Sequence, residues 1–72
     1  MGLNRVDWRQ VIFDLNAKNL SVLVIARKIR VERTSVIAWR DIGREPFYRN
    51  GRHLLLLWAK HTGRDPDKPP FI

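Results

Sequence analysis

The sequence predicts an all-α domain of four helices followed by an extended C-terminal tail. Apolar residues recur at intervals of three and four in four separate segments, which is the period of a helix packed on one face. Residues that commonly begin or end helices separate these segments. There is no cysteine among the 72 residues, so helix packing must supply the stability without disulfides. We therefore expect one domain at residues 1–63 and a proline-rich tail at residues 64–72.

The first helix is expected to begin after Asp7 and to close at Lys18 and Asn19. Asp7 is a good N-cap, and Gln10 three residues later completes a pattern that is typical of a capping box. Phe13 lies off the apolar stripe, so we expect it to pack on the C-terminal segment or to contact another copy of the chain. The residues of the stripe itself are Trp8, Val11, Ile12 and Leu15.

The next two helices are expected over residues 22–29 and 33–42, joined by a tight turn at residues 30–32. Ser21 is a suitable N-cap for the first of them, and Leu20 and Ile25 are spaced for a hydrophobic staple. Gly43 is expected to end the second in a left-handed conformation. The residues expected to face the core are Ile25, Ala26, Ile29, Val36 and Trp39.

The last helix is expected over residues 51–62, after Pro46 and with Asn50 as its N-cap. Three prolines keep the tail out of a helix and favour an extended chain. Its terminal Phe71 and Ile72 either fold back onto their own domain, which we prefer, or reach a second subunit. The apolar face of the last helix consists of Leu54, Leu55, Leu57, Trp58 and His61.

The charge of the chain is strongly positive and is concentrated in its middle. Fourteen Lys and Arg residues against seven Asp and Glu residues give +7. Between residues 27 and 52 lie eight basic and three acidic residues, which leaves +5 of the +7 in this stretch. Arginine pairs with phosphate through two hydrogen bonds, so nucleic acid is the leading partner, ahead of an acidic protein or an anionic membrane.

Residues 20–43 resemble the helix-turn-helix of phage repressors of the Cro/CI type, in the lambda-repressor-like superfamily. The resemblance extends over roughly residues 20–63, and the segment GREPFYRNG at 43–51 looks like that of small phage regulators. There are two departures: Arg30 replaces the usual turn glycine, and Glu32 replaces the usual Ser or Thr cap. Arg30 must adopt a positive φ, or the turn must differ. The matching residues are Ile25, Ala26, Ile29, Val31, Val36, Trp39 and Gly43.

The resemblance implies a four-helix lambda-repressor-like fold and a double-stranded DNA-binding transcriptional regulator, phage or prophage encoded. It places residues 33–42 in the major groove, with Arg33, Thr34, Ile37 and Ala38 reading bases. Arg33 can pair with guanine, Thr34 can bond a base or phosphate, and the two apolar residues can touch a thymine methyl. A homodimer on a palindromic site is the default.

A loop rich in arginine next to a helix N-terminus is suited to binding phosphate, because free N–H groups and the helix dipole both favour an anion. Tyr48 is an equally good candidate for a core position with its hydroxyl at the surface. The residues expected to contact phosphate are Arg27, Arg30, Arg40, Arg44, Tyr48, Arg49 and Arg52.

Two other functions stay open on the sequence. In the first, the helix-turn-helix fold is reused by a phage-encoded inhibitor that binds a host enzyme. The residues that favour this function are Glu32, Asp41, Ile37 and the apolar residues 22–24. We expect those three apolar residues to be half covered by the first helix, although they cannot all face the core. The second alternative is a small DNA-packaging subunit, which would bind DNA and form rings.

The sequence favours no enzyme, cofactor or metal ion. His53 and His61 are eight residues apart, no cysteine accompanies them, and the four glycines are scattered. The longest apolar run, residues 54–59, is far shorter than the roughly 18–20 residues of a membrane span. The charged N-terminus lacks a signal-peptide core. We therefore expect a cytoplasmic protein of a bacterial or phage-infected cell, without a membrane partner.

Overall fold

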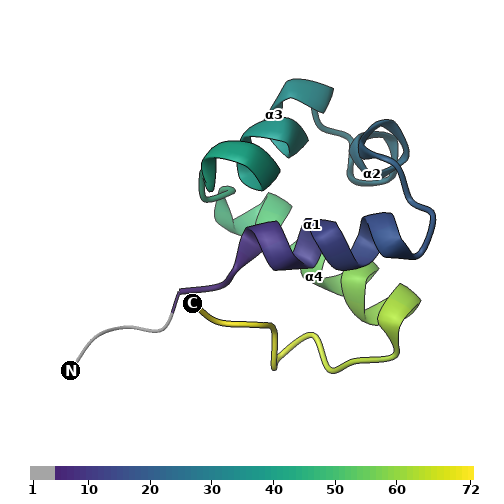
Figure 1. Ribbon diagram of the computed structural model, residues 1–72, viewed down its shortest axis with the longest axis vertical. Coiled ribbons are helices and arrows are strands. Elements are labelled where there is room, and N and C mark those ends of the chain that lie inside the picture. Colours follow the sequence, from purple (N-terminus) through teal and green to yellow (C-terminus); the bar gives the residue numbers. More distant parts are fainter. Residues whose placement is uncertain (1–4) are drawn as a thin grey trace.

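The structure, a computed structural model, describes residues 5–72 and is all-α (Figure 1). Helices α1 (Trp8–Ala17) and α2 (Val22–Ile29) come first. Helix α3 (Arg33–Ile37) continues directly into a π-helical turn, η1 (Ala38–Ile42), and α4 (Tyr48–Thr62) follows after a short loop. Residues 5–72 form no β-strand beyond one isolated bridge near the two ends of the chain. The predicted class and the number of helical segments are confirmed.

Helix α1 lies at the centre of the packing, with α4 on one side and η1 on the other (Figure 1). Helix α2 contacts α3 and, more weakly, α4. Every residue of the predicted α1 stripe is buried, as are all five core residues predicted for the next two helices. The helical periodicity therefore identified the core of the first three segments correctly. Of the face predicted for the last helix, Leu54 and Trp58 are buried, whereas Leu55, Leu57 and His61 are half-buried. The buried apolar residues are Trp8, Val11, Ile12, Leu15, Leu20, Ile25, Ala26, Ile29, Val36, Trp39, Leu54 and Trp58.

The N-caps predicted for α1 and α2 are both present. Asp7 Oδ1 accepts from the Gln10 N–H at 3.1 Å, and Ser21 Oγ accepts from the Val24 N–H at 3.2 Å. The reciprocal bond of a capping box is missing in α1. The Asp7 N–H donates instead to the Pro70 carbonyl at 2.8 Å, so the tail occupies the donor that a capping box would use.

A partly buried hydrogen bond joins α1 to α4. The ring of Trp58 is fully buried, and its Nε1 donates to Asp14 Oδ2 at 3.0 Å. The other oxygen of the same carboxylate accepts from the Gln10 side chain at 2.8 Å. Asp14 lies beside the apolar stripe, and helical periodicity gave no sign of its role.

Helix α4 begins at Tyr48, so the prediction of a start at residue 51 with Asn50 as N-cap is wrong. Phe47 is the N-cap and makes no side-chain capping bond. Gly51 lies inside the helix, and Trp8 packs closely on it: a Cβ atom there would lie 3.1 Å from Trp8 Cη2. The glycine is thus explained by close packing, and no helix start is needed at this point.

The tail folds back onto its own domain, as preferred from the sequence. Its Ile72 N–H donates to the Arg5 carbonyl at 2.8 Å, next to the bridge between Val6 and Phe71. The tail is not extended throughout, since the Lys68 N–H closes a turn on the Asp65 carbonyl at 3.0 Å. Among residues 5–72, no helix has the length and apolar character needed to cross a membrane.

Candidate nucleic-acid interface

The turn between α2 and α3 places a non-glycine residue in the left-handed region. Arg30 has φ 59° and ψ 54°, and the Val31 N–H donates to the Ala26 carbonyl at 3.0 Å. Of the two possibilities that the sequence left open, Arg30 therefore adopts the positive φ of the glycine it replaces. This conformation costs roughly 1 kcal/mol in a residue with a Cβ atom.

The first turn of α3 presents its polar side chains to solvent. Arg33 and Thr34 are exposed, whereas Val36 and Trp39 are buried and anchor the opposite side of the segment. Ile37 and Ala38, the two apolar residues expected to read bases, are half-buried. Of the four predicted base-reading residues, the structure thus makes Arg33 and Thr34 the most accessible.

The predicted helix over residues 33–42 has the right extent, but its second half is wider than an α-helix. In η1 the carbonyl of Ala38 accepts from the N–H groups of Gly43 and, at 3.1 Å, of Arg44. Those bonds span five and six residues, where an α-helix spans four. Gly43, with φ 74°, ends the segment in the predicted left-handed conformation.

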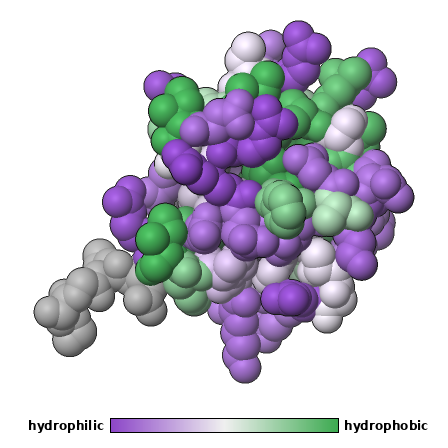
Figure 2. Space-filling view, viewed as in Figure 1, coloured by the Kyte–Doolittle hydropathy of each residue, from purple (hydrophilic) through white to green (hydrophobic). Residues whose placement is uncertain are grey.

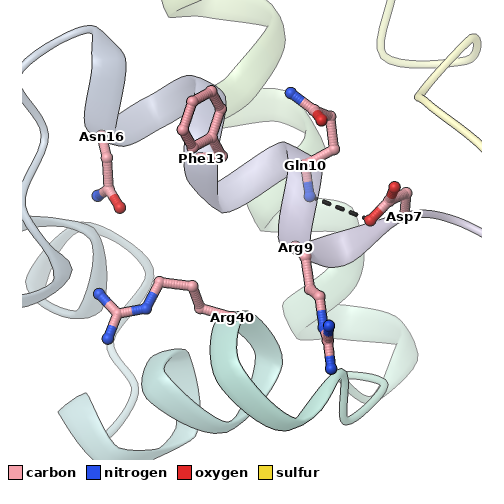
Figure 3. A pocket seen from close by; sticks show the side chains of 6 residues that line it. All are labelled: Asp7, Arg9, Gln10, Phe13, Asn16 and Arg40. Atoms are coloured by element: carbon pink, nitrogen blue, oxygen red, sulfur yellow. Dashed lines mark hydrogen bonds between the residues drawn. The ribbon is translucent and has the colours of Figure 1, made fainter.

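Arg9 of α1 holds the end of this segment, a contact that the sequence did not indicate. Its Nη2 donates to the Asp41 carbonyl at 3.2 Å, and its Nε would lie 3.3 Å from a Cβ atom at Gly43. Figure 3 shows Arg9 reaching from α1 toward the last turn of η1. The two partners are 32 residues apart, so only the tertiary fold brings them together.

Arg9 and Arg40 line a groove between α1 and η1, with a volume of about 350 Å³. The Arg40 side chain points along this groove toward Asn16 (Figure 3). Two hydrogen bonds of 2.7 and 3.0 Å join its guanidinium to the Asp41 carboxylate. The hydrogen bond from Arg40 lowers the pKa of Asp41, and the same bond raises the pKa of Arg40. Arg40 was predicted to contact phosphate, but here its charge is balanced by its neighbour.

The other predicted phosphate contacts are spread over several places. Arg30 shares a hollow of about 320 Å³ with Lys28 and His53. Tyr48 and Arg52 line a different hollow, of about 390 Å³, which has no residue in common with the other two. Tyr48 is exposed, so the alternative of a core position is wrong.

The ion pairs separate the arginines into two groups. Two of the predicted phosphate-contacting arginines form ion pairs: Arg40 with Asp41, and Arg52 with Asp67 of the tail at 3.2 Å. A third ion pair joins Arg5 to Glu45 at 3.7 Å. Within residues 5–72, the remaining predicted DNA-contacting arginines form no ion pair. These are Arg27, Arg30, Arg33, Arg44 and Arg49, and all are exposed.

A small apolar patch lies at the start of α2. Val22 is half-buried, in line with the expected covering, but Leu23 and Val24 keep 43% and 37% of their surface exposed. Figure 2 shows hydrophobic surface over α2, bordered by hydrophilic residues. Two apolar side chains in the first turn are thus available to a partner.

The arrangement is suited to binding a polyanion. Within residues 5–72, the His, Asp and Glu side chains form no cluster of three that would hold a metal ion. Unpaired guanidinium groups next to an exposed helix end supply charge and hydrogen-bond donors.

No protein-family model, curated protein or solved structure matches this chain.

Proposed function

We propose that the protein is a double-stranded DNA-binding transcriptional regulator of the helix-turn-helix type, similar to phage Cro and repressor proteins. In this proposal residues 33–42 enter the major groove. The supporting observation is the exposed start of α3, where Arg33 and Thr34 face solvent after a tight turn while Val36 and Trp39 are anchored in the core. Residues at the N-terminal end of a recognition helix are the ones that reach base edges.

The exposed side chains allow limited base recognition. Arg33 has the donors to pair with O6 and N7 of guanine, and the Thr34 hydroxyl can bond a base or a phosphate. Ile37 and Ala38 offer apolar contact to a thymine methyl over the smaller part of their surface that stays exposed. One subunit therefore reads few base pairs, and a homodimer on a palindromic site would double the number.

The unpaired arginines supply the affinity for the DNA backbone. Arg27 and Arg30 lie at the end of α2 and in the turn, Arg33 begins α3, and Arg44 and Arg49 lie just before and just inside the start of α4. Arg40 and Arg52 contribute less in this proposal, because a phosphate would have to replace Asp41 or Asp67 as their partner. Tyr48 offers an exposed hydroxyl as a neutral donor to phosphate.

Duplex binding measured against salt concentration tests the proposal. Contact with about five phosphates predicts a slope of log affinity against log salt near −4 to −5. Arg33→Ala should weaken a site selected from random duplexes by about 1–3 kcal/mol and relax the preference at one base pair. Arg64→Ala is the matched control, because it removes the same charge beside Lys18 and Thr62, at the opposite end of α4 from Tyr48.

Equal losses on selected and random duplexes would make Arg33 a phosphate contact only. A response to salt that is flat would contradict DNA binding itself. It would favour the second candidate, an inhibitor that binds a host protein, for which the exposed side chains of Leu23 and Val24 are the supporting observation.

A further inference from the structure

Two neighbouring aromatic side chains are almost completely exposed at the start of α4. Phe47 keeps 84% and Tyr48 88% of their surface accessible. Single exposed apolar residues are common on proteins, but this pair stands where a helix normally has a capping side chain. Phe47 is the N-cap and provides no acceptor, although Ser or Asp there would stabilise the helix. Phe47 therefore stabilises the helix less than a capping residue would, which is often the case for residues at functional sites.

The surroundings of this pair are cationic. Arg44 and Arg49 flank it in the chain, both are exposed, and neither forms an ion pair within the described residues 5–72. The intervening acid, Glu45, is already paired with Arg5. Aromatic rings set among arginines are the combination that binds nucleic acid, since the rings stack on bases while the guanidinium groups contact phosphates.

The aromatic pair lies close to the segment proposed to read DNA. Phe47 is five positions after Ile42, the end of η1, so the Cα atoms of the two residues are at most about 17 Å apart. That reach corresponds to about five base pairs along a duplex, at about 3.4 Å per base pair. Phe47 can therefore meet the DNA only beside the base pairs that residues 33–42 contact.

Building on the DNA-binding function proposed above, we propose that Phe47 is an apolar wedge that inserts into the base stack next to the recognition site and bends the duplex. The ring loses few contacts with its own domain when it leaves solvent for the base stack, because most of its surface is exposed. Inserted apolar side chains partly unstack a base step, and the resulting bend brings more protein surface onto the DNA. Arg44 and Arg49 then contact the phosphates on either side of the step.

A second copy of the chain is a less suitable occupant of this surface. A two-fold symmetric contact brings the same patch of both subunits together. Arg44 and Arg49 of one subunit would face the same arginines of the other, with no free carboxylate of the segment to offset them. Such like-charge contact opposes association, whereas a DNA duplex supplies the complementary charge.

The test uses the full chain and a duplex of about 30 base pairs that the wild type selects from a random library, labelled at both ends for energy transfer. Wild-type protein should bend it by at least about 20°. Phe47→Ala should lose most of the bend and about tenfold in affinity, while keeping the base preference that depends on Arg33. Phe47→Leu should retain both, because leucine also acts as a wedge. Ile72→Ala, which truncates a side chain that is 83% exposed in the tail, should change neither.

An unchanged bend and affinity in Phe47→Ala would overturn the wedge and leave the DNA-binding function intact. A second result would also overturn the wedge: sedimentation without DNA in which the wild type is a dimer and Phe47→Ala is a monomer. The surface around Phe47 would then bind a second copy of the chain. Failure of the wild type to bind any duplex would overturn the DNA-binding function, and the wedge with it.

Discussion

Helices α1 and α2 begin at residues that cap them, whereas α3 and α4 do not. Asp7 and Ser21 each accept a hydrogen bond from the first turn of their helix. Glu32 and Phe47 form no side-chain capping bond. The first-turn N–H groups of α3 and α4 thus remain without a side-chain acceptor at the two places where the proposed DNA contacts begin.

The difference separates helix starts that a side chain stabilises from helix starts that leave their first N–H groups open to a ligand. The capped helices place their apolar faces in the core, and α1 is further tied to α4 by the bond between Asp14 and Trp58. The uncapped starts carry exposed polar or aromatic side chains such as Arg33 and Tyr48. Sites that break local rules of stability are where function is expected.

The largest effect is expected in the core that the two capped helices help to form. Trp58→Ala should lower the free energy of unfolding by about 3–5 kcal/mol, because it opens a large cavity between α1 and α4. Urea denaturation measures the loss. Leu56→Ala on the exposed side of the same helix is the control, with an expected change within about 0.5 kcal/mol. Similar losses in both variants would contradict the core described here.

The hydrogen bond between Trp58 and Asp14 predicts a smaller loss of stability when it is removed. Asp14→Ala should lower the free energy of unfolding by about 1–3 kcal/mol, because Trp58 Nε1 is left buried without its acceptor. In a Trp58→Phe background the same substitution should cost less, since no indole N–H then needs a partner. A double-mutant cycle measures this coupling, and strict additivity would show that the bond contributes nothing.

Exchanging the two kinds of helix start tests the comparison directly. Ser21→Ala should destabilise the protein by about 0.5–2 kcal/mol, because it removes a cap. Phe47→Ser should stabilise it by up to about 1 kcal/mol while it weakens duplex binding. Thermal unfolding and duplex titration measure the two properties. A destabilised Phe47→Ser would mean that the exposed ring contributes to folding.

The smallest effect concerns Asp41 at the end of η1. The hydrogen bond from Arg40 holds the pKa of Asp41 below its ordinary value of 3.8. Ionised Asp41 therefore favours the folded state above pH 3.8, and this contribution is lost as the pH falls through the lowered pKa. The stability difference between wild type and Asp41→Asn should shrink on acidification. The difference is expected to be small, because the pair is exposed to solvent. A stability difference that grows at low pH would contradict the pairing of Asp41 with Arg40.

Several features of the site could be predicted from the sequence, and others could not. Arg33 and Thr34 follow from the position of the turn, and the left-handed Arg30 is one of the two alternatives that the helix-turn-helix pattern left open. The start of α4 was misjudged because Asn50 and Gly51 are also typical of a helix start, and nothing local shows that Trp8 packs on the glycine. The contact of Arg9 with the end of η1 joins residues 32 positions apart and leaves no local signal.

The sequence by itself determined that there are four helical segments, the caps at Asp7 and Ser21, and the buried faces of the first three segments, because these depend on residues within one or two turns of each other. Apart from Arg40, whose partner Asp41 is next to it in the chain, only the tertiary structure decided which of the predicted site arginines are paired. Arg52 lies against Asp67 because the tail returns to the domain, while Arg33 and Arg49 stay unpaired among residues 5–72. Net charge is a property of composition, but the charge available to a ligand depends on which carboxylates the fold brings within reach.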